Sequence, residues 1–298
     1  MSGKVLVIGD VMTDVIVMPE GPLVKGSDRR ATVRSRPGGS GANQAVWLSA
    51  MGAEVVFAAR VGATDRSFLE NYFRGLDVVP VLAADKEQPS GVLVTIVDPD
   101  GERSFLTDRG ANLNLCVDDL PDSLLEEIGM VVVSGYSFFA PGPRAAVQQL
   151  FAEARARGIA VAVDPASVGF LLEVGIDQFL DWTSGADWIF ANESEAEALT
   201  GHSDADAQMR ALGEHFTTVL IKRGARGAAL GGRQGIRVSL PATEVEVVVD
   251  STGAGDAFAG GFIAAHLAGE DETTALGKAI AAGARAVQAI GGQPQPDR

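Results

Sequence analysis

The chain has 298 residues, 46% of them hydrophobic, which is enough apolar material for a sizeable core in one large α/β domain or two modest ones. A formal net charge of −15 and a pI of about 4.6 argue against non-specific binding to nucleic acid or to an anionic membrane, though not against an anionic substrate. The single cysteine, Cys116, excludes an internal disulfide, and no apolar stretch reaches the roughly 18 residues of a membrane span, so we predict a cytoplasmic protein.

The first apolar run predicts a buried strand at residues 4–8, because it is too short for the core of a signal peptide. Gly9 and Asp10 follow this strand directly, and Asp14 stands four residues further on. A strand followed by glycine and carboxylates is typical of the ligand-facing ends of parallel strands. Asp14 either binds hydroxyl groups of a ligand or is an ordinary turn aspartate, and both interpretations stay open here.

Two segments interrupt the alternation of strands and helices that the rest of the chain shows. Residues 15–36 lack helical periodicity and alternate like a strand at 30–34. Residues 90–97 and 103–107 predict a hairpin that turns at 98–101. Insertions at about 12–36 and 88–110 therefore predict a small β-sheet lid over a site, and a lid of that kind excludes water from reactive phosphates.

A glycine-rich stretch at 37–44 precedes a predicted helix at 45–51. Gly39 and Gly41 would let a ligand approach the backbone closely, and the Asn43 side chain can donate and accept hydrogen bonds toward hydroxyl groups. On its own, such a turn before a helix is weak evidence for a site.

From residue 54 onward, strand patterns alternate with helical ones. Strands are predicted at 54–59, 130–134, 159–164, 188–191, 218–222, 228–230 and 245–249, and helices at 66–74, 122–128, 143–157, 176–182, 194–200, 205–215, 257–267 and 272–289. This alternation implies right-handed crossovers and a mainly parallel sheet with helices on both faces. The polar run at 291–298 is predicted to be a mobile tail.

Two polar clusters follow predicted strands. Asn192 and Glu195 begin a helix, where Glu195 either holds the water shell of a Mg²⁺ ion or simply complements the helix dipole. Lys222, Gly224 and Gly227 form a loop that either contacts a nucleotide or is an ordinary basic turn.

The stretch 250–256 (Asp-Ser-Thr-Gly-Ala-Gly-Asp) lies between the predicted strand 245–249 and the predicted helix 257–267. Its small residues permit a tight turn, and the helix start would offer unpaired N–H groups to an anion such as phosphate. A carboxylate at Asp256 would repel a phosphate, so its position suits a base that takes a proton from an attacking hydroxyl. The alternative is an N-cap aspartate after a glycine-rich turn.

Taken together, four motifs resemble the PfkB/ribokinase family of carbohydrate kinases. Residues 38–43 (GGSGAN) are similar to the first signature of the family, and residues 250–256 to its second. Residues 192–195 match its Asn-x-x-Glu motif, and residues 222–224 resemble its nucleotide-side loop. Their order and spacing fit the family over essentially the whole chain.

The resemblance implies a single ribokinase-like kinase domain over residues 1–298, an α/β three-layer αβα sandwich with a mainly parallel central sheet and the β-sheet lid. It implies an enzyme that transfers the γ-phosphoryl group of ATP, with Mg²⁺, to a hydroxyl of a small carbohydrate. Such a transfer depends on positioning and charge neutralisation more than on covalent chemistry.

The resemblance also assigns roles to residues. Asp256 would be the general base, and the amides of Gly253, Ala254 and Gly255 would form an anion hole for the phosphoryl group. The other implied contacts are Asp14, Gly39, Ser40, Gly41 and Asn43 for the sugar; Asn192, Glu195, Lys222, Gly224, Gly227 and Thr252 for the nucleotide and its phosphates, with Glu195 holding Mg²⁺ through water; and Asp250, Thr252, Ala286, Ala289 and Gly291 for a monovalent cation such as K⁺.

Departures from the pattern bear on the acceptor. Ribokinases carry an asparagine where Met12 stands, and a glutamate where this chain has Ser134, Gly135 and Tyr136, so ribose itself is disfavoured. Tyr136 becomes a candidate substrate contact. The lid segments also hold six arginines, and a solvated lid face is the favoured explanation for them. They are Arg29, Arg30, Arg34, Arg36, Arg103 and Arg109.

The alternative is an acceptor with a carboxylate or phosphate, such as a sugar acid of the 2-keto-3-deoxygluconate type, with Arg109 as the candidate contact. A nucleoside acceptor is a further alternative. A nucleotide-binding oxidoreductase is disfavoured, because a dinucleotide-binding fingerprint belongs in an early βαβ unit. A non-catalytic sugar or nucleotide sensor is disfavoured by the presence of Asp256. Exposed lid edges make a homodimer plausible.

Overall fold

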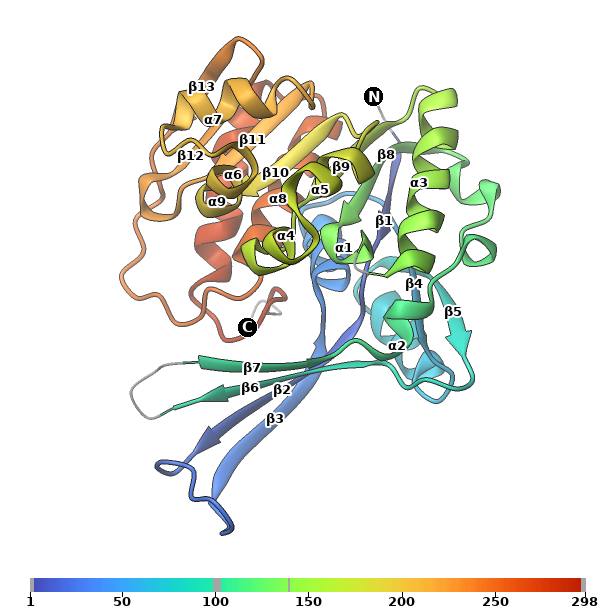
Figure 1. The fold of residues 1–298 in the computed structure, drawn as a ribbon, viewed down its shortest axis with the longest axis vertical. Helices are drawn as coiled ribbons and strands as arrows, with labels where there is room; N and C mark the ends of the chain where they lie inside the picture. Colours follow the sequence, from blue (N-terminus) through green and yellow to red (C-terminus); the bar gives the residue numbers. More distant parts are fainter. Residues whose placement is uncertain (1–2, 99–102, 139, 296–298) are drawn as a thin grey trace.

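The computed structural model describes residues 3–98, 103–138 and 140–295 (Figure 1). These residues form a nine-stranded sheet and a separate four-stranded sheet. The large sheet runs in the order β13-β12-β11-β10-β9-β8-β1-β4-β5. Its members are β1 (Lys4–Ile8), β4 (Val55–Gly62), β5 (Val78–Asp85), β8 (Ile128–Ser134), β9 (Ala160–Asp164), β10 (Trp188–Asn192), β11 (Thr218–Lys222), β12 (Ala228–Gly232) and β13 (Gly235–Leu240).

The strands from β5 across to β11 pair in parallel, and β12 and β13 complete the sheet as antiparallel partners at one edge. Successive side chains of a strand point to opposite faces, and β1 shows the consequence. Val5 and Val7 belong to one hydrophobic cluster, whereas Leu6 and Ile8 belong to the other. Both faces of the sheet are therefore covered, which confirms the predicted αβα architecture.

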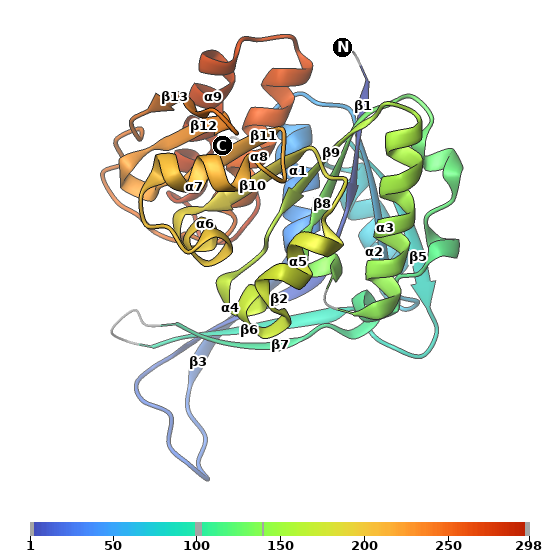
Figure 2. The ribbon, with the colours of Figure 1, turned by 45° about the horizontal axis from the view of Figure 1, so that its top comes forward.

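The helices divide between the two clusters (Figure 2). On one face lie α1 (Ser40–Ala50), α2 (Arg66–Arg74), α8 (Ala254–Leu267) and α9 (Glu272–Ala286). On the other lie α3 (Pro141–Ala156), α4 (Val168–Val174), α5 (Ile176–Trp182), α6 (Glu193–Thr200) and α7 (Ala205–Leu212). No helix of the described residues is long and apolar enough to cross a membrane.

The four-stranded sheet is the lid, and it projects from one end of the large sheet (Figure 1). It runs in the order β3-β2-β6-β7, with β2 (Met12–Pro19), β3 (Ala31–Gly38), β6 (Gly91–Val97) and β7 (Arg103–Asp108). β2 and β6 pair in parallel, and the two outer pairs are antiparallel. Most of the predicted hairpin turn at 98–101 lies outside the described residues.

Several sequence-based expectations are wrong. The segment 245–249 is not a strand but an irregular loop, and its Val247 and Val248 side chains are 64% exposed. The predicted helix 122–128 is a 3₁₀ turn at Asp122–Leu125 that leads into β8. β5, β13 and α4 were not predicted. α1 begins at Ser40, so the glycine-rich stretch supplies its first turn instead of preceding it.

Candidate active site

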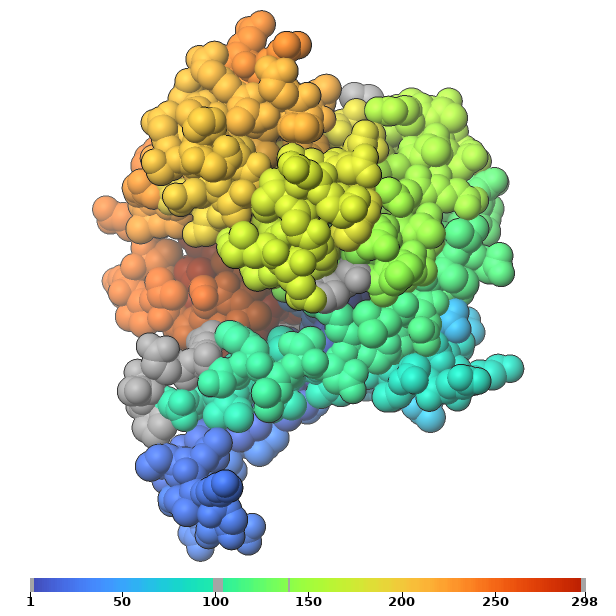
Figure 3. Space-filling model, viewed as in Figure 1, coloured from blue at the N-terminus to red at the C-terminus, as the bar shows by residue number. Residues whose placement is uncertain are grey.

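The carboxyl ends of the parallel strands and the base of the lid surround a cavity of about 550 Å³. The space-filling view shows the molecule hollowed between the lid and the C-terminal part of the chain (Figure 3). Polar side chains from many elements line the cavity, because parallel strands place the residues that follow them along one edge of a sheet. Those that matter below are Asp10, Asp14, Ser40, Asn43, Arg109, Tyr136, Asp164, Asn192, Glu195, Lys222, Thr252 and Asp256.

Asp256 lies in the first turn of α8, where that helix meets the start of α1. Its carboxylate accepts hydrogen bonds from Ser40 Oγ at 2.9 Å, from Asn43 Nδ2 at 3.3 Å and from Gln44 Nε2 at 3.1 Å. The side chain borders the cavity and is only 9% exposed. Burial raises the pKa of Asp256 to about 7, and the nearby Asp164 raises it further, while Ser40, Lys222 and Asn43 oppose the rise. A carboxyl group with this pKa can accept a proton near neutral pH.

Gly253 precedes α8 in the left-handed conformation, with φ of +74°. A Cβ at this position would collide with the carbonyl oxygen of Gly292, so the close approach of two backbones requires glycine here. The amides of Ala254, Gly255 and Asp256 begin the helix, and amides of a first turn have no partner within their own helix. The Ala254 N–H donates weakly to the carbonyl oxygen of Ser251, at 3.3 Å, so the amides of Gly255 and Asp256 are the ones most available to an anion.

The start of α1 packs tightly against the end of β1. Gly39 has φ of +96°, and a Cβ there would lie 2.7 Å from the carbonyl oxygen of Asp10. Gly41 donates its backbone N–H to Asp10 Oδ1 at 3.2 Å. The glycines of the first signature thus serve helix–strand packing, besides any approach of a ligand. The same tight junction lets Ser40 and Asn43 reach Asp256.

Two acceptor atoms in this cavity lack partners among the described residues. Asp14 Oδ1 and Asn43 Oδ1 are buried and accept no hydrogen bond from the described part of the chain. Burial and the neighbouring Asp10 raise the pKa of Asp14 to about 7, although Arg36 lowers it. Unpaired buried oxygens are costly unless a ligand satisfies them, so both atoms suit the hydroxyl groups of a sugar.

Arg109 and Tyr136 form another part of the wall. The Arg109 guanidinium lies 3.9 Å from the centroid of the Tyr136 ring, and its Nη1 lies 3.9 Å from Asp10 Oδ2. The Arg109 side chain is 15% exposed. Burial raises the pKa of Tyr136, so this residue remains a neutral phenol. The pair combines a fixed positive charge with a hydroxyl group at the cavity wall.

A second cavity, of about 950 Å³, adjoins the first and shares Asn192, Lys222 and Gly255 with it. It is lined by Gly224, Gly227, the loop at 242–248 and the inner faces of α8 and α9. Of the residues implied for the nucleotide, Asn192, Lys222, Gly224 and Gly227 line this second cavity, whereas Glu195 and Thr252 line the first. The first cavity also holds most of the residues implied for the sugar. The shared residues mark the place where a group could pass from one cleft to the other.

Lys222 lies at this junction. Its Nζ donates to Asp164 Oδ2 at 2.8 Å, and a Cβ built on Gly255 would lie 3.0 Å from the same nitrogen. Burial alone would lower the pKa of Lys222, but Asp164 and Glu195 raise it overall, so the side chain stays charged. A buried ammonium beside the start of α8 adds a positive charge where helix amides already favour an anion.

Asn192 and Glu195 form a reciprocal capping box at the start of α6. The Glu195 N–H donates to Asn192 Oδ1 at 2.8 Å, and the Asn192 N–H donates to Glu195 Oε2 at 2.7 Å. The local structural interpretation of this motif is therefore correct. Glu195 also lies in the cavity wall, where it is only 3% exposed. Its burial and the nearby negative charge of Asp164 raise the pKa of Glu195 to about 7, although Lys222 lowers it. A buried carboxylate of this kind favours a cation close by.

The residues of the predicted cation site lie in two neighbouring segments. Asp250 accepts hydrogen bonds from the Thr252 N–H at 2.9 Å and from the Gly291 N–H at 2.8 Å. Ala286 ends α9, and its carbonyl accepts from the Ala289 N–H at 3.2 Å. Thr252 also borders the first cavity. The structure thus brings Gly291 to Asp250. In the described residues, no group of three or more His, Cys, Asp and Glu side chains is arranged to hold a metal.

Some residues of the site were missed by the sequence analysis. Gln44 stands one helical turn after Ser40 and hydrogen-bonds Asp256, and this spacing was the available signal. Asp164 ends β9, lines the cavity and pairs with Lys222. The polar run after residue 290 was expected to be mobile, whereas Gly291, Gly292 and Gln293 are buried.

Comparison with known proteins gives consistent results. The profile of the pfkB family carbohydrate kinases matches residues 2–298. A curated relative, "Bifunctional protein HldE" of Pseudomonas aeruginosa, is 31% identical over 304 aligned positions, which cover 95% of this chain. The chain spans about 60% of the length of that relative.

Solved structures share the fold at lower identity. A probable sugar kinase from Rhizobium etli superposes with a TM-score of 0.89 at 21% identity, over 99% of this chain and 96% of that one. A putative ribokinase II from E. coli, in complex with ATP and Mg²⁺, superposes with a TM-score of 0.86 at 22% identity, over 98% and 94% of the two chains.

Proposed function

The chain belongs to the PfkB family of carbohydrate kinases, and we propose that it transfers the γ-phosphoryl group of ATP to a hydroxyl of a small carbohydrate, with Asp256 as the general base. The observation that carries the proposal is the position of Asp256, a buried carboxylate with a raised pKa beside the start of α8. A kinase needs a base on the acceptor side and positive charge on the donor side. Asp256 borders the smaller cavity, and Lys222 and Gly255, next to Asp256 in the chain, line both cavities.

In the proposed mechanism the acceptor lies in the smaller cavity. Asp14 and Asn43 accept hydrogen bonds from its hydroxyl groups, and Gly39, Ser40 and Tyr136 complete the wall. Gly41 holds the start of α1 against Asp10. Because Ser40, Asn43 and Gln44 hold both oxygens of the Asp256 carboxylate, the base has a fixed orientation toward the reacting hydroxyl. It takes the proton of that hydroxyl as the oxygen attacks phosphorus.

ATP occupies the larger cleft in this proposal, between the Gly224–Arg226 turn, the loop at 242–248 and helices α8 and α9. The amides of Gly253, Ala254 and Gly255 and the Lys222 ammonium receive the charge that develops on the transferred group. Gly227 and Thr252 contribute backbone contacts. The larger cleft and its shared residues fit a nucleotide whose phosphates point toward Asp256.

Mg²⁺ is the expected partner of the phosphates, and the E. coli structure named above contains both ATP and Mg²⁺. The buried Glu195 carboxylate, with its raised pKa and its neighbour Asp164, fits a cation held through water. Bound Mg²⁺ would neutralise phosphate charge, and Asn192 would orient the phosphates. A monovalent ion such as K⁺ at Asp250 stays a prediction, and replacing K⁺ by tetramethylammonium in the assay tests it.

The direct test is ADP release with MgATP and a panel of acceptors: D-ribose, D-fructose, adenosine and 2-keto-3-deoxygluconate. We expect at least one to be phosphorylated, and we expect Asp256→Asn to abolish that activity. An Asp256→Asn variant with undiminished turnover would contradict the proposal. Binding of ATP and sugar without any phosphorylated product, from these acceptors or related ones, would support the sensor alternative.

A sugar-acid acceptor is a second candidate, favoured by the Arg109 side chain. It borders the cavity, is largely buried and stacks on Tyr136, so its charge is fixed at the wall. We expect Arg109→Ala to raise the KM for 2-keto-3-deoxygluconate at least about tenfold, the loss typical of one charge-assisted hydrogen bond, and to leave a neutral sugar unaffected. Equal activity of the variant on both classes would count against this acceptor.

We further propose that residues 1–298 act as one kinase domain and that the protein dimerises through the lid. β3 and β7 are the edge strands of the lid sheet, and Val33 and Leu106 on them are 59% and 60% exposed. Exposed apolar edges favour pairing with a second copy. Sedimentation equilibrium of the wild type and of Leu106→Asp tests this, and a monomeric wild type would contradict it.

A further inference from the structure

The segment after α9 packs against the turn at residues 250–253, which leads into the proposed anion hole at the start of α8. We call residues 290–293 of this segment the strap, and residues 250–253 the anion-hole turn. Gly291 donates its N–H to Asp250 Oδ2 at 2.8 Å, and Trp47 Nε1 donates to the carbonyl oxygen of Gly292 at 2.8 Å. The Tyr72 hydroxyl donates to Gln293 Oε1. The strap is therefore fastened to the turn before α8 and to helices α1 and α2.

The strap braces the backbone that carries the anion hole. The Asp250 carboxylate joins the two segments, because its other oxygen accepts from the Thr252 N–H at 2.9 Å. Gly253 packs directly against Gly292, with no space for a Cβ between them. A displacement of the strap therefore changes the position of Gly253 and of the amides that follow it.

The lid is connected to this strap through Arg36. Arg36 lies on lid strand β3, and its Nη1 donates to the carbonyl oxygen of Ile290. Its guanidinium packs against Gly291, where a Cβ would collide with it. Arg36 also pairs in register with Asp14 on β2, and its charge lowers the pKa of that carboxyl group. One side chain thus touches the strap while its strand partner is a predicted sugar-binding residue.

We propose that Arg36 is a positioning residue that holds the strap, and through it the anion-hole turn, in place when the lid is docked. The bond from Arg36 to Ile290 joins the lid to the sheet domain, so it forms only when β3 lies against the strap. The geometry of Gly253–Gly255 then depends on the lid. This inference rests on the proposed function, in which those amides stabilise the transferred phosphoryl group.

The test compares Arg36→Ala and Arg36→Lys with a matched control, Arg29→Ala. Arg29 also donates from its guanidinium to a backbone carbonyl, that of Pro22 at 3.1 Å, but within the lid itself. Misplacement of reacting groups by about 1 Å can cost roughly a hundredfold in rate. We therefore expect Arg36→Ala to lower kcat about ten- to a hundredfold with the best acceptor of the panel, with the KM for ATP changed less than about twofold.

Three further readouts separate positioning from a structural role. Arg36→Lys should recover part of kcat, methylguanidine in the buffer should raise kcat of Arg36→Ala, and Arg29→Ala should match the wild type. A variant Arg36→Ala that changes only the KM for the acceptor, or that behaves like Arg29→Ala, would overturn the proposal.

A second measurement does not depend on the acceptor. Binding of MgADP with and without aluminium fluoride, a mimic of the transferred phosphoryl group, reports the anion hole directly. We expect Arg36→Ala to bind MgADP like the wild type but to lose most of the gain in affinity that fluoride gives. Retention of the full gain would refute the coupling. Because failure of the proposed function would instead show as an active Asp256→Asn variant, the two failures are distinguishable.

Discussion

Replacement of Asp256 by asparagine is the most informative single change, because it keeps the shape of the side chain and removes the proposed base. The amide group introduced by Asp256→Asn would meet the Asn43 amino group, which in the wild type donates to the carboxylate at 3.3 Å. A flip of Asn43 resolves this contact, since its Oδ1 is buried and has no partner in the described part of the chain. We therefore expect the variant to fold.

The expected loss of activity follows from the chemistry. General-base catalysis contributes about 10²- to 10⁴-fold, so kcat of Asp256→Asn should fall at least about a hundredfold. The pH profile gives an independent check. Because the pKa of Asp256 is about 7, kcat/KM of the wild type should rise with pH up to about 7 and level off above it. The variant should lose this dependence.

The same substitution should increase stability at alkaline pH. The folded pKa of Asp256 is raised from 3.8 to about 7, so the folded state keeps a proton that the unfolded state has lost, and wild-type stability falls as pH rises from about 4 to about 7. At pH 8 the full cost of the buried charge is on the order of 4 kcal/mol, and at pH 5 it is about 2 kcal/mol. Asparagine carries no charge and avoids this cost.

Urea unfolding at pH 5 and pH 8, together with ADP release between pH 5.5 and 9, measures both effects. A variant that keeps more than half of wild-type kcat would refute the assignment of the base. A variant that is inactive but no more stable than the wild type at pH 8 would refute the burial argument, because the charge would then be solvated in the folded protein.

Three other changes have defined outcomes. Asp14→Asn should raise the KM for the acceptor about tenfold and leave the rising limb of the pH profile in place, as kinetics across pH would show. Gly253→Ala should lower the free energy of unfolding in urea by about 1–3 kcal/mol and remove most of kcat. Gly269 also has a positive φ but has open space around it, so the control Gly269→Ala should be less destabilised and should keep its kcat. Equal effects of the two substitutions would contradict the packing argument. Lys222→Met should leave Asp164 without its 2.8 Å partner and lower the free energy of unfolding by about 3 kcal/mol. It should also weaken MgATP binding measured by calorimetry, and unchanged binding would show that Lys222 does not contact the phosphates.

The sequence was most informative where a motif lay at the end of a strand. Asp14, Asn192, Lys222 and Asp256 are far apart in the chain, but the parallel sheet brings the residues after its strands to one edge. Local motifs together with the predicted alternation were therefore enough to indicate the fold and the composition of the cavity. They also placed Asn192 and Glu195 at the start of a helix, where the structure shows a reciprocal capping box. The role of Glu195 toward Mg²⁺ stays a prediction.

The errors arose where long-range contacts decide local structure. The β-branched run at 245–249 has the pattern of a strand, but β13 already occupies that edge of the large sheet. The N–H groups of Val249 and Asp250 instead donate to the carbonyl oxygen of Val287, and the run becomes a loop along the larger cavity. Val245 and Val248 of this loop line the larger cavity, where they could contact an apolar face of a ligand.

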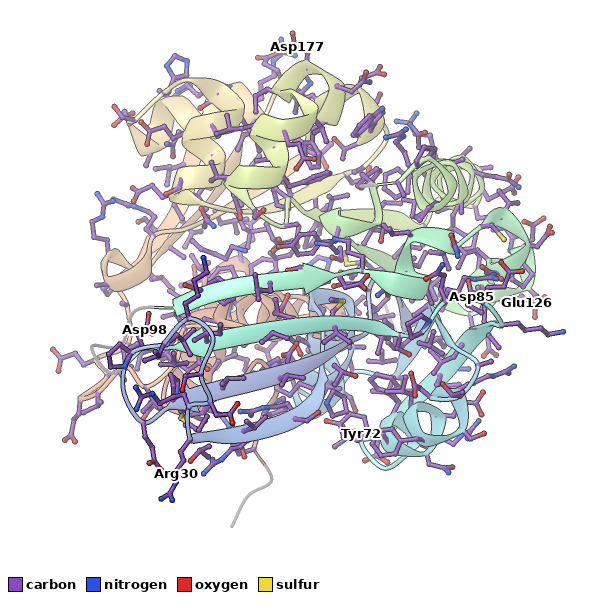
Figure 4. The ribbon with its side chains drawn as sticks, turned by 60° about the horizontal axis from the view of Figure 1, so that its bottom comes forward. Arg30, Tyr72, Asp85, Asp98, Glu126 and Asp177 are labelled. Carbon is purple, nitrogen blue, oxygen red and sulfur yellow. The ribbon has the colours of Figure 1, made fainter. Side chains whose placement is uncertain are left out.

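The strap is the converse case, because here a distant contact orders a segment whose own sequence predicts mobility. A polar, glycine-rich end of a chain predicts mobility, because no hydrophobic residue offers a core contact. Here Gly292 is useful because it lacks a side chain, and its partner Trp47 is 245 residues away. No pattern within the segment contains that information. Figure 4 shows the lid sheet from below, with Arg30 labelled at its outer end, next to the start of β3.

An acidic site for an anionic nucleotide needs a physical explanation. Asp14, Glu195 and Asp256 each have a pKa raised to about 7 by burial, so near neutral pH each carboxyl group is about half protonated in the absence of a cation. Their repulsion of phosphate is then reduced, and Lys222 with the start of α8 supplies the attraction. A cation near Glu195 would favour loss of its proton, whereas Asp256 must lose its own before it can act. The burial that makes the pocket tolerant of ATP is therefore also what adjusts the proposed base to neutral pH.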